Sequence, residues 1–73
     1  MHEEPRLAEQ GLRRLTLRHS GEGNFIVWAL DNRGRYLRLL VNEIGDYRGR
    51  VILPAGTRYA TVTADGAWSM TRR

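Results

Sequence analysis

Apolar and polar residues alternate along much of this chain, and glycines interrupt the alternation at regular intervals. Ala60, Val62 and Ala64, for example, alternate with tyrosine and threonine residues. This period of two residues indicates a strand with one buried and one wet face. Short strands separated by turn signals about every ten residues are typical of a β-sandwich or barrel. The turn signals here are the glycines Gly11, Gly21, Gly23, Gly34, Gly45, Gly49, Gly56 and Gly66.

The pattern predicts an all-β fold, a small antiparallel β-sandwich or partly open barrel of about six strands. Residues 1–11 carry too few apolar side chains to hold a helix, so we expect a flexible tail or linker remnant, or at most a short helical turn. Residues 12–73 then form a single antiparallel β domain. The expected strands are Leu12–His19, Asn24–Leu30, Arg35–Asn42, Arg50–Leu53, Arg58–Ala64 and Ala67–Thr71.

Three connections carry specific turn chemistry. The four residues from Asp31 to Gly34 fit a type I turn that ends on a glycine in the left-handed conformation. Pro54 fixes φ for a second turn, which ends at Gly56. The dipeptide 65–66 is Asp-Gly between two β-rich segments, which predicts a two-residue hairpin with positive φ.

Two further connections lack such a signature. The segment GEGN at 21–24 leads into a strand, whereas a glycine-rich phosphate cradle leads into a helix N-terminus. We therefore expect a hairpin loop at 21–24. The segment 43–49 is expected to be a longer loop.

The alternation also assigns faces to the expected strands. In the first strand Leu15 and Leu17 should be buried, and their neighbours should be exposed. Residues 25–30 are apolar on both faces, which indicates a central strand covered on both sides, with 35–42 beside it in the middle of the structure. In the latter strand Leu37, Leu39 and Val41 should face the core. The same reasoning predicts that Trp28, Trp68 and Met70 are buried.

Four segments carry a resemblance to a known kind of domain. They read GNFIVWALD at 23–31, LLVNEIG at 39–45, LPAG at 53–56 and ADGAWSMT at 64–71. Together they resemble a small bacterial accessory β-sandwich domain, similar to the pre-peptidase C-terminal-like jelly-roll modules. The resemblance covers 15–71, and Arg58 departs from it because an aromatic residue usually stands there. It implies a non-catalytic module of a larger bacterial cell-surface or secreted protein, outside the cytoplasm.

Composition narrows the class of protein further. The 73 residues include no cysteine, so neither disulfides nor thiolate metal sites can supplement a small core. No segment approaches the roughly 18 consecutive apolar residues of a membrane span. The net charge is +4, and every one of the 12 basic residues is arginine. Guanidinium groups suit phosphate or carboxylate recognition, although codon preference in a GC-rich genome explains the same excess.

The polar residues do not predict a catalytic site. His19 and Ser20 are adjacent in a strand and should point to opposite faces, which disfavours a nucleophile and base pair. We therefore expect His19 to be an ordinary histidine at the end of a strand. His2 lies in the expected tail, and two histidines without cysteine argue against a structural zinc site. We predict a non-enzymatic protein with no catalytic residues, no metal site and no cofactor.

Four carboxylates fall in the expected turns, and turn formation explains at least two of them. Asp31 and Asp65 should cap backbone amides within their own turns. Nothing in the spacing brings two carboxylates together for glycoside hydrolysis. Calcium binding by loop oxygens stays an alternative, although the EF-hand spacing is absent. The four are Asp31, Glu43, Asp46 and Asp65.

The remaining candidate is an outward surface that combines arginine with tyrosine. Such a surface on a small β-barrel suggests binding of single-stranded nucleic acid through phosphate contacts and base stacking. The alternative is that the arginine stems only cover the sheet. An exposed Trp28 or Tyr47 could instead form a carbohydrate platform. The candidate residues, placed on one wet face by their parity, are Arg14, Arg18, Tyr36, Arg38, Arg50 and Tyr59.

From the sequence, the leading interpretation is an accessory module that mediates interaction with a protein or a cell surface. The first alternative is a basic β-barrel that binds single-stranded nucleic acid, and the second is a carbohydrate- or calcium-binding module. Strand-to-strand dimerisation is open, although arginines at the sheet edges would oppose it.

Overall fold

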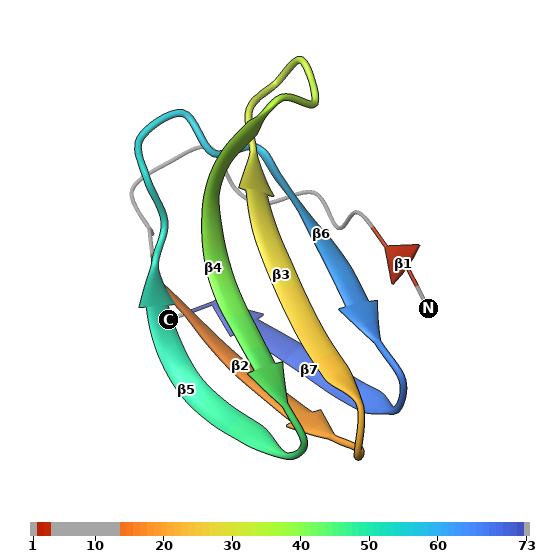
Figure 1. Ribbon diagram of the computed structural model, residues 1–73. Helices are drawn as coiled ribbons and strands as arrows, with labels where there is room; N and C mark the ends of the chain where they lie inside the picture. The colour runs from red at the N-terminus through yellow and green to blue at the C-terminus, as the bar shows by residue number, and fades with distance from the viewer. Residues whose placement is uncertain (1, 4–13, 73) are drawn as a thin grey trace.

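The computed structural model describes residues 2–3 and 14–72, and all of the regular structure in them is β-strand (Figure 1). The predicted all-β class is thereby confirmed. No helix that could cross a membrane occurs among these residues. Apart from His2 and Glu3, the expected tail lies outside the described residues. The strands are β1 (His2–Glu3), β2 (Arg14–Ser20), β3 (Asn24–Leu30), β4 (Tyr36–Ile44), β5 (Tyr47–Ile52), β6 (Tyr59–Ala64) and β7 (Ala67–Arg72).

The strands form two antiparallel sheets that pack face to face. One sheet has the order β1-β6-β3-β4 and the other has the order β5-β2-β7. Figure 1 shows the first sheet in front and the second behind it. The two-residue β1 extends the first sheet by pairing with β6, with His2 opposite Thr63. The six longer strands therefore make a small sandwich of two three-stranded layers.

The core lies between the two layers and is built by the predicted alternation. On β2, Leu15 and Leu17 are fully buried, and on β6 the inward residues include Val62. Large apolar side chains from facing strands meet there, which removes their surface from water and stabilises the fold. Trp68 and Met70 of β7 are half-buried and pack against this cluster. Its buried members are Leu15, Leu17, Phe25, Val27, Val41, Leu53, Ala60, Val62 and Ala64.

Three short connections carry the chain from one sheet to the other at the same end of the molecule, the lower end in Figure 1. We call the connections 20–24, 44–47 and 64–67 the three corners. The predicted hairpins at 21–24 and 65–66 are therefore wrong, because the strands that they join lie in different sheets. The expected loop at 43–49 is also wrong, because β4 continues to Ile44 and β5 begins at Tyr47.

Gly66 allows the backbone of its corner to lie close to the backbone of another corner. Its φ is not positive, contrary to the expected hairpin. A Cβ atom at this position would collide with the carbonyl oxygen of Ser20, which belongs to another corner. Only a residue without a side chain lets the two corners pass so closely.

The two turns at the opposite end of the sandwich agree with the prediction. The amide of Gly34 donates to the carbonyl of Asp31 at 3.0 Å, and Gly34 has a φ of 80°. The amide of Thr57 donates to the carbonyl of Pro54 at 3.3 Å, and Gly56 has a φ of 89°. Glycine adopts positive φ at a lower cost than residues that carry a Cβ atom.

β4 departs from the simple alternation. Its pairing with β3 shifts register twice, between Val27 and Trp28 and again between Ala29 and Leu30. Each shift places an extra residue in β4 and reverses the parity of the residues beyond it. Leu39 consequently lies on the outer side, and Leu37 is the extra residue of the second shift, so both are exposed and not buried as predicted. β3 lies between β6 and β4, which confirms its central position, whereas β4 is an edge strand. The predicted cover on both faces of β3 is wrong, because Ile26 and Trp28 on its outer side are only half-buried.

Candidate anion-binding face

Four arginines project from the outer side of the sheet β5-β2-β7. On β2 the inward Leu15 and Leu17 alternate with exposed Arg14 and Arg18. On β5 the exposed residues likewise alternate with half-buried ones, and two of them are arginines. We call this surface the arginine face, and its cationic residues are Arg14, Arg18, Arg48 and Arg50.

The register brings these arginines together across the strands. Arg18 lies directly opposite Arg48 on one side and opposite Ser69 of β7 on the other. Two residues along β2, Thr16 is flanked in the same way by Arg50 and Thr71. The cross-strand neighbours of Arg18, Arg48 and Arg50 on this face are therefore hydroxyl groups or a second guanidinium.

The face is hollowed along its length. One groove of about 860 Å³ lies over 14–18, 48–50 and Thr71. A second groove, of about 550 Å³, lies over 18–20, 46–48 and 67–69 at the corner end. Both are lined by Arg18 and Arg48, so the two grooves adjoin at these residues, and we refer to the pair of grooves as the channel.

Among the described residues that line this channel, Asp46 is the one acidic residue. One of its carboxylate oxygens accepts the amide of Gly21 at 3.0 Å. The ion pairs within the described part of the chain join His19 to Asp65 and Arg35 to Asp31. None of them neutralises the arginine face.

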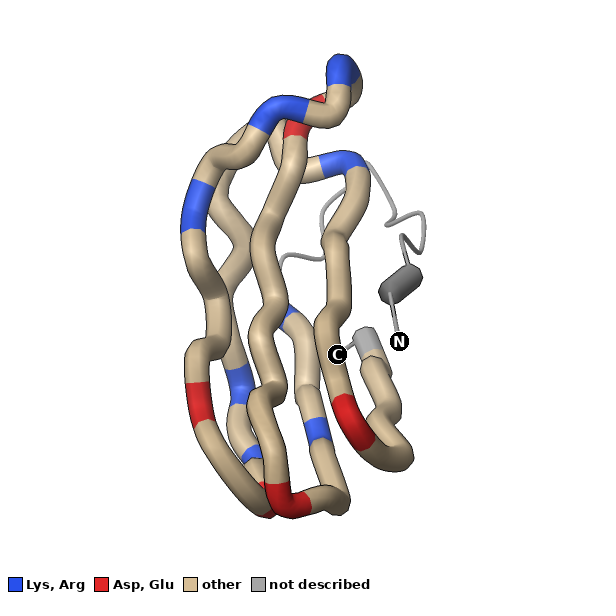
Figure 2. The backbone as a smooth tube through the Cα atoms, turned by 45° about the vertical axis from the view of Figure 1, so that its right-hand side comes forward, with Lys and Arg blue, Asp and Glu red and all other residues tan. Residues whose placement is uncertain are grey.

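The six residues predicted for a binding surface do not share one face. Arg14, Arg18 and Arg50 lie together on the arginine face, as their pairing in β2 and β5 requires. The other three lie on the opposite sheet: Tyr36 and Arg38 on β4, and Tyr59 on β6. Figure 2 shows the arginines of β2 and β5 apart from those around the β3–β4 loop.

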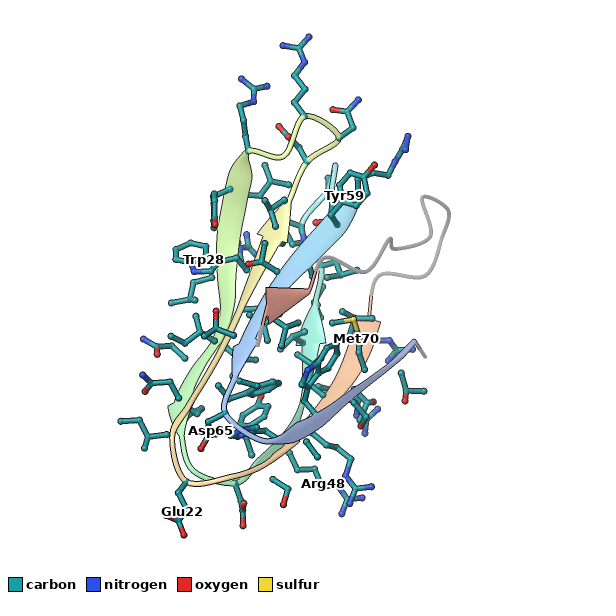
Figure 3. All side chains as sticks on the ribbon, turned by 90° about the vertical axis from the view of Figure 1, so that its right-hand side faces the viewer. Glu22, Trp28, Arg48, Tyr59, Asp65 and Met70 are labelled. Carbon is teal, nitrogen blue, oxygen red and sulfur yellow. The ribbon has the colours of Figure 1, made fainter. Side chains whose placement is uncertain are left out.

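Arg48 belongs to the arginine face but was not predicted. The sequence pattern placed it in an expected loop at 43–49, whereas it lies within β5. The signal that could have found it is the spacing of Arg48 and Arg50, two residues apart, which puts both on the same side of a strand. Figure 3 shows Arg48 and Trp28 on different sides of the molecule.

The outer side of the sheet β6-β3-β4 instead carries apolar and aromatic side chains among threonines and asparagines. Trp28 was predicted to be core, but it is half-buried on this outer face, where its ring meets Tyr36 edge-on at 5.1 Å. Leu39 lies opposite Trp28 on β4. Tyr36 is 60% exposed and Ile44 is 75% exposed. By contrast, Tyr47 packs inward, with its ring 5.9 Å from that of Phe25, and so offers no carbohydrate platform.

His19 lies at the end of β2, and its ring contacts residues of two corners. It is buried beneath the corner end, and its ring stacks on Phe25 at 4.7 Å. Its Nε2 lies 3.0 Å from Asp65 Oδ1, and its Nδ1 lies 2.8 Å from the carbonyl oxygen of Gly45. Ser20, by contrast, is exposed on the other side of the strand, as predicted.

Asp65 caps backbone amides, mainly those of another corner and not only those of its own turn. Its Oδ2 accepts the amides of Gly23 at 2.8 Å and Glu22 at 3.2 Å, both in a different corner. The hydrogen bond from Gly23, together with those from Glu22 and His19, holds the pKa of Asp65 below its usual value. Sequence reasoning could not anticipate this contact, because the partners are about forty residues apart.

Asp31, in contrast, has its predicted role within its own turn. Its carboxylate accepts the amides of Arg33 at 2.8 Å and Arg35 at 2.9 Å. The Arg35 guanidinium adds a further bond at 3.1 Å. The hydrogen bond from the Arg35 amide is the largest of the effects that lower the pKa of Asp31.

Residues 2–3 and 14–72 contain no group of three His, Cys, Asp or Glu side chains that could hold a metal ion. The calcium alternative therefore has no ligand cluster in this part of the chain. Comparisons with protein-family models, with curated proteins and with solved structures found no match. The resemblance to jelly-roll accessory modules stays a prediction.

Proposed function

We propose that this chain is a non-enzymatic binding module that holds single-stranded nucleic acid by its phosphates along the arginine face. The observation that carries the proposal is the direct pairing of Arg18 with Arg48, on a face that has no ion pair within the described residues. Like charges directly opposite each other destabilise a sheet, so a free protein gains nothing from this arrangement. A phosphate bound between the two guanidinium groups removes the repulsion.

The chemistry of the channel supports the same ligand. Guanidinium groups bind phosphate oxygens through paired hydrogen bonds, and the hydroxyls of Thr16, Ser69 and Thr71 can donate to the same oxygens. The channel crosses three strands, which suits a linear anion more than a small one. An extended single strand fits a shallow open channel, because its binding depends on backbone charge and tolerates different base sequences.

The test is binding of a labelled oligothymidylate, measured by fluorescence anisotropy at several salt concentrations. We expect affinity to fall steeply with salt, with a slope of about 0.7 per phosphate contact in a plot of log K against log salt. Arg48→Gln and Arg18→Gln should each weaken binding and reduce the slope by about one contact. Arg33→Gln is the matched control, since it removes the same charge from the exposed loop at the far end.

Two outcomes would contradict the proposal. One is the absence of binding even at low salt. The other is an equal loss of affinity in Arg33→Gln, which would mean that net charge, and not the arginine face, attracts the oligonucleotide.

Interaction with a protein partner, the leading interpretation from the sequence, is the second candidate. It is favoured by the apolar and aromatic side chains on the outer side of β6-β3-β4, where Tyr36 and Leu39 are exposed beside Trp28. Exposed aromatic clusters of this kind are common in protein interfaces. Sedimentation of the purified chain over a range of concentrations tests self-association through this face. Tyr36→Ser should abolish any association, whereas Arg48→Gln should not.

A further inference from the structure

The three corners of the sandwich are tied together through one buried side chain. His19 contacts the carbonyl of Gly45 in one corner and the carboxylate of Asp65 in another. Asp65 in turn accepts the amide of Gly23 in the third corner, and the amide of Gly45 donates to the carbonyl of Gly23 at 2.9 Å. Figure 3 shows Asp65 at the same end of the molecule as Glu22 of that third corner. The corners are far apart in sequence, so their arrangement depends on these contacts.

Both ring nitrogens of His19 face hydrogen-bond acceptors. A carbonyl oxygen lies at Nδ1 and a carboxylate oxygen at Nε2, at 2.8 and 3.0 Å. A neutral imidazole has one N–H group and can donate only one of these bonds. Asp65 is ionised above its lowered pKa and cannot supply the missing proton. Both bonds exist together only when His19 is an imidazolium.

Two groups beside the ring can interact favourably with a cation. The side chain is fully buried, but Asp65 forms an ion pair with it. The ring also lies parallel to that of Phe25, with an interplanar angle of 4°, and the face of an aromatic ring attracts a cation. Other ionisable groups lie on the elements around it. They are Asp46 and Glu22 in the adjoining corners, Glu43 opposite Phe25 on β4, Tyr47 and Arg48 on β5, and Arg18 on β2.

We propose that His19 is a pH-sensitive latch, which holds the three corners together while it carries both ring protons. Loss of one proton removes one of its two hydrogen bonds to the corners. The deprotonated ring nitrogen and the oxygen opposite it are then both acceptors, with no hydrogen between them. The corner end of the sandwich then opens more often, while the turns at 31–34 and 54–57 are unaffected. The latch does not depend on the proposed function, because it involves none of the arginines.

Hydrogen exchange at the corner amides tests the latch in the intact chain. The amides of Gly23 and Gly45 donate into the cluster, and that of Gly34 reports on the distant turn. After correction for intrinsic exchange, we expect the protection of Gly23 and Gly45 to fall about tenfold or more between about pH 5.5 and pH 8. The protection of Gly34 should stay constant. Ring nitrogen resonances, assigned with His2→Gln, should show that both nitrogens of His19 are protonated at the lower pH.

Asp65→Asn is the matched variant. A carboxamide can donate to Nε2 while its oxygen still accepts the amide of Gly23, so a neutral His19 then satisfies both of its partners. Corner protection in this variant should no longer change over the same pH range. A single protonated ring nitrogen in the parent chain at about pH 5.5, or the same pH dependence in both proteins, would overturn the proposal. If the variant does not fold, the ring resonances of the parent chain decide alone.

Discussion

Arg18 and Arg48 are direct cross-strand neighbours on the outer side of β2 and β5, and no carboxylate pairs with either within the described residues. Such a pair raises the free energy of the folded state. Local conflicts of this kind are expected where a site serves a ligand.

Because of this arrangement, we expect a substitution at Arg48 to have opposite effects on stability and on binding. Arg48→Glu should place a carboxylate opposite Arg18 and replace a repulsive pair by an attractive one, which stabilises the fold by about 0.2–1 kcal/mol. Urea denaturation measures this gain. The same variant should lose most of its affinity for an oligonucleotide, because it neutralises a second arginine besides removing the first. A variant that is less stable than the parent would contradict this explanation of the pair.

Gly66 should tolerate no side chain. Gly66→Ala places a methyl group against the carbonyl oxygen of Ser20, so one of two corners must shift. We expect a loss of about 1–3 kcal/mol in the free energy of unfolding, as for other overpacked positions. Gly34→Ala is the comparison, since it meets no atom within 4 Å and its cost comes from positive φ alone. Unchanged amide resonances around Ser20 in Gly66→Ala would argue against the collision.

Phe25 should be the least replaceable core residue. It is fully buried and its ring also stacks on His19. Phe25→Ala should cost about 3–5 kcal/mol, which is most of the stability of a domain this small. Ile52→Ala, at a position that is 68% exposed, should cost little. Thermal unfolding of both variants, followed by circular dichroism, distinguishes the two costs.

Acid should destabilise the fold through its two capping carboxylates. The pKa of Asp31 and that of Asp65 are lowered in the folded protein by hydrogen bonds from backbone amides. Their contribution is therefore present above the unfolded value of about 3.9 and is lost as the pH falls through the folded value. The melting temperature should decline below about pH 4. Asp31→Asn should make this decline shallower, and an unchanged slope would mean that Asp31 adds nothing.

The sequence predicted those features that depend on neighbours along the chain. The alternation of Leu15 and Leu17 with arginines and the glycine turn at Gly34 are local properties, and both are confirmed. It could not predict which strands share a sheet, so the corner at 65–66 was taken for a hairpin. The same limit applies to the contact of Asp65 with the amides of another corner, since pairing between distant segments depends on the whole fold.

For the candidate site, alternation along the strands correctly placed Arg14, Arg18 and Arg50 on one side of their sheet. It could not predict that the six candidate residues are divided between two sheets. The alternation of apolar and polar residues in β4 does not reveal its two shifts of register. The exposure of Leu37 and Leu39, where these shifts occur, could therefore not be predicted. Arg48 was missed because only two residues separate β4 from β5. The sequence pattern around this short connection predicted one long loop.

The two ends of the sandwich differ in how freely they can be altered. Gly34 and Gly56 stand at turns where an added atom meets nothing within 4 Å, whereas the corner end is crossed by contacts from His19 and Asp65. A peptide tag or fluorophore attachment site can therefore be grafted into either turn without touching the arginine face. Insertions at 32–33 should keep every contact of the corners, which makes the turn end the place to engineer this small scaffold.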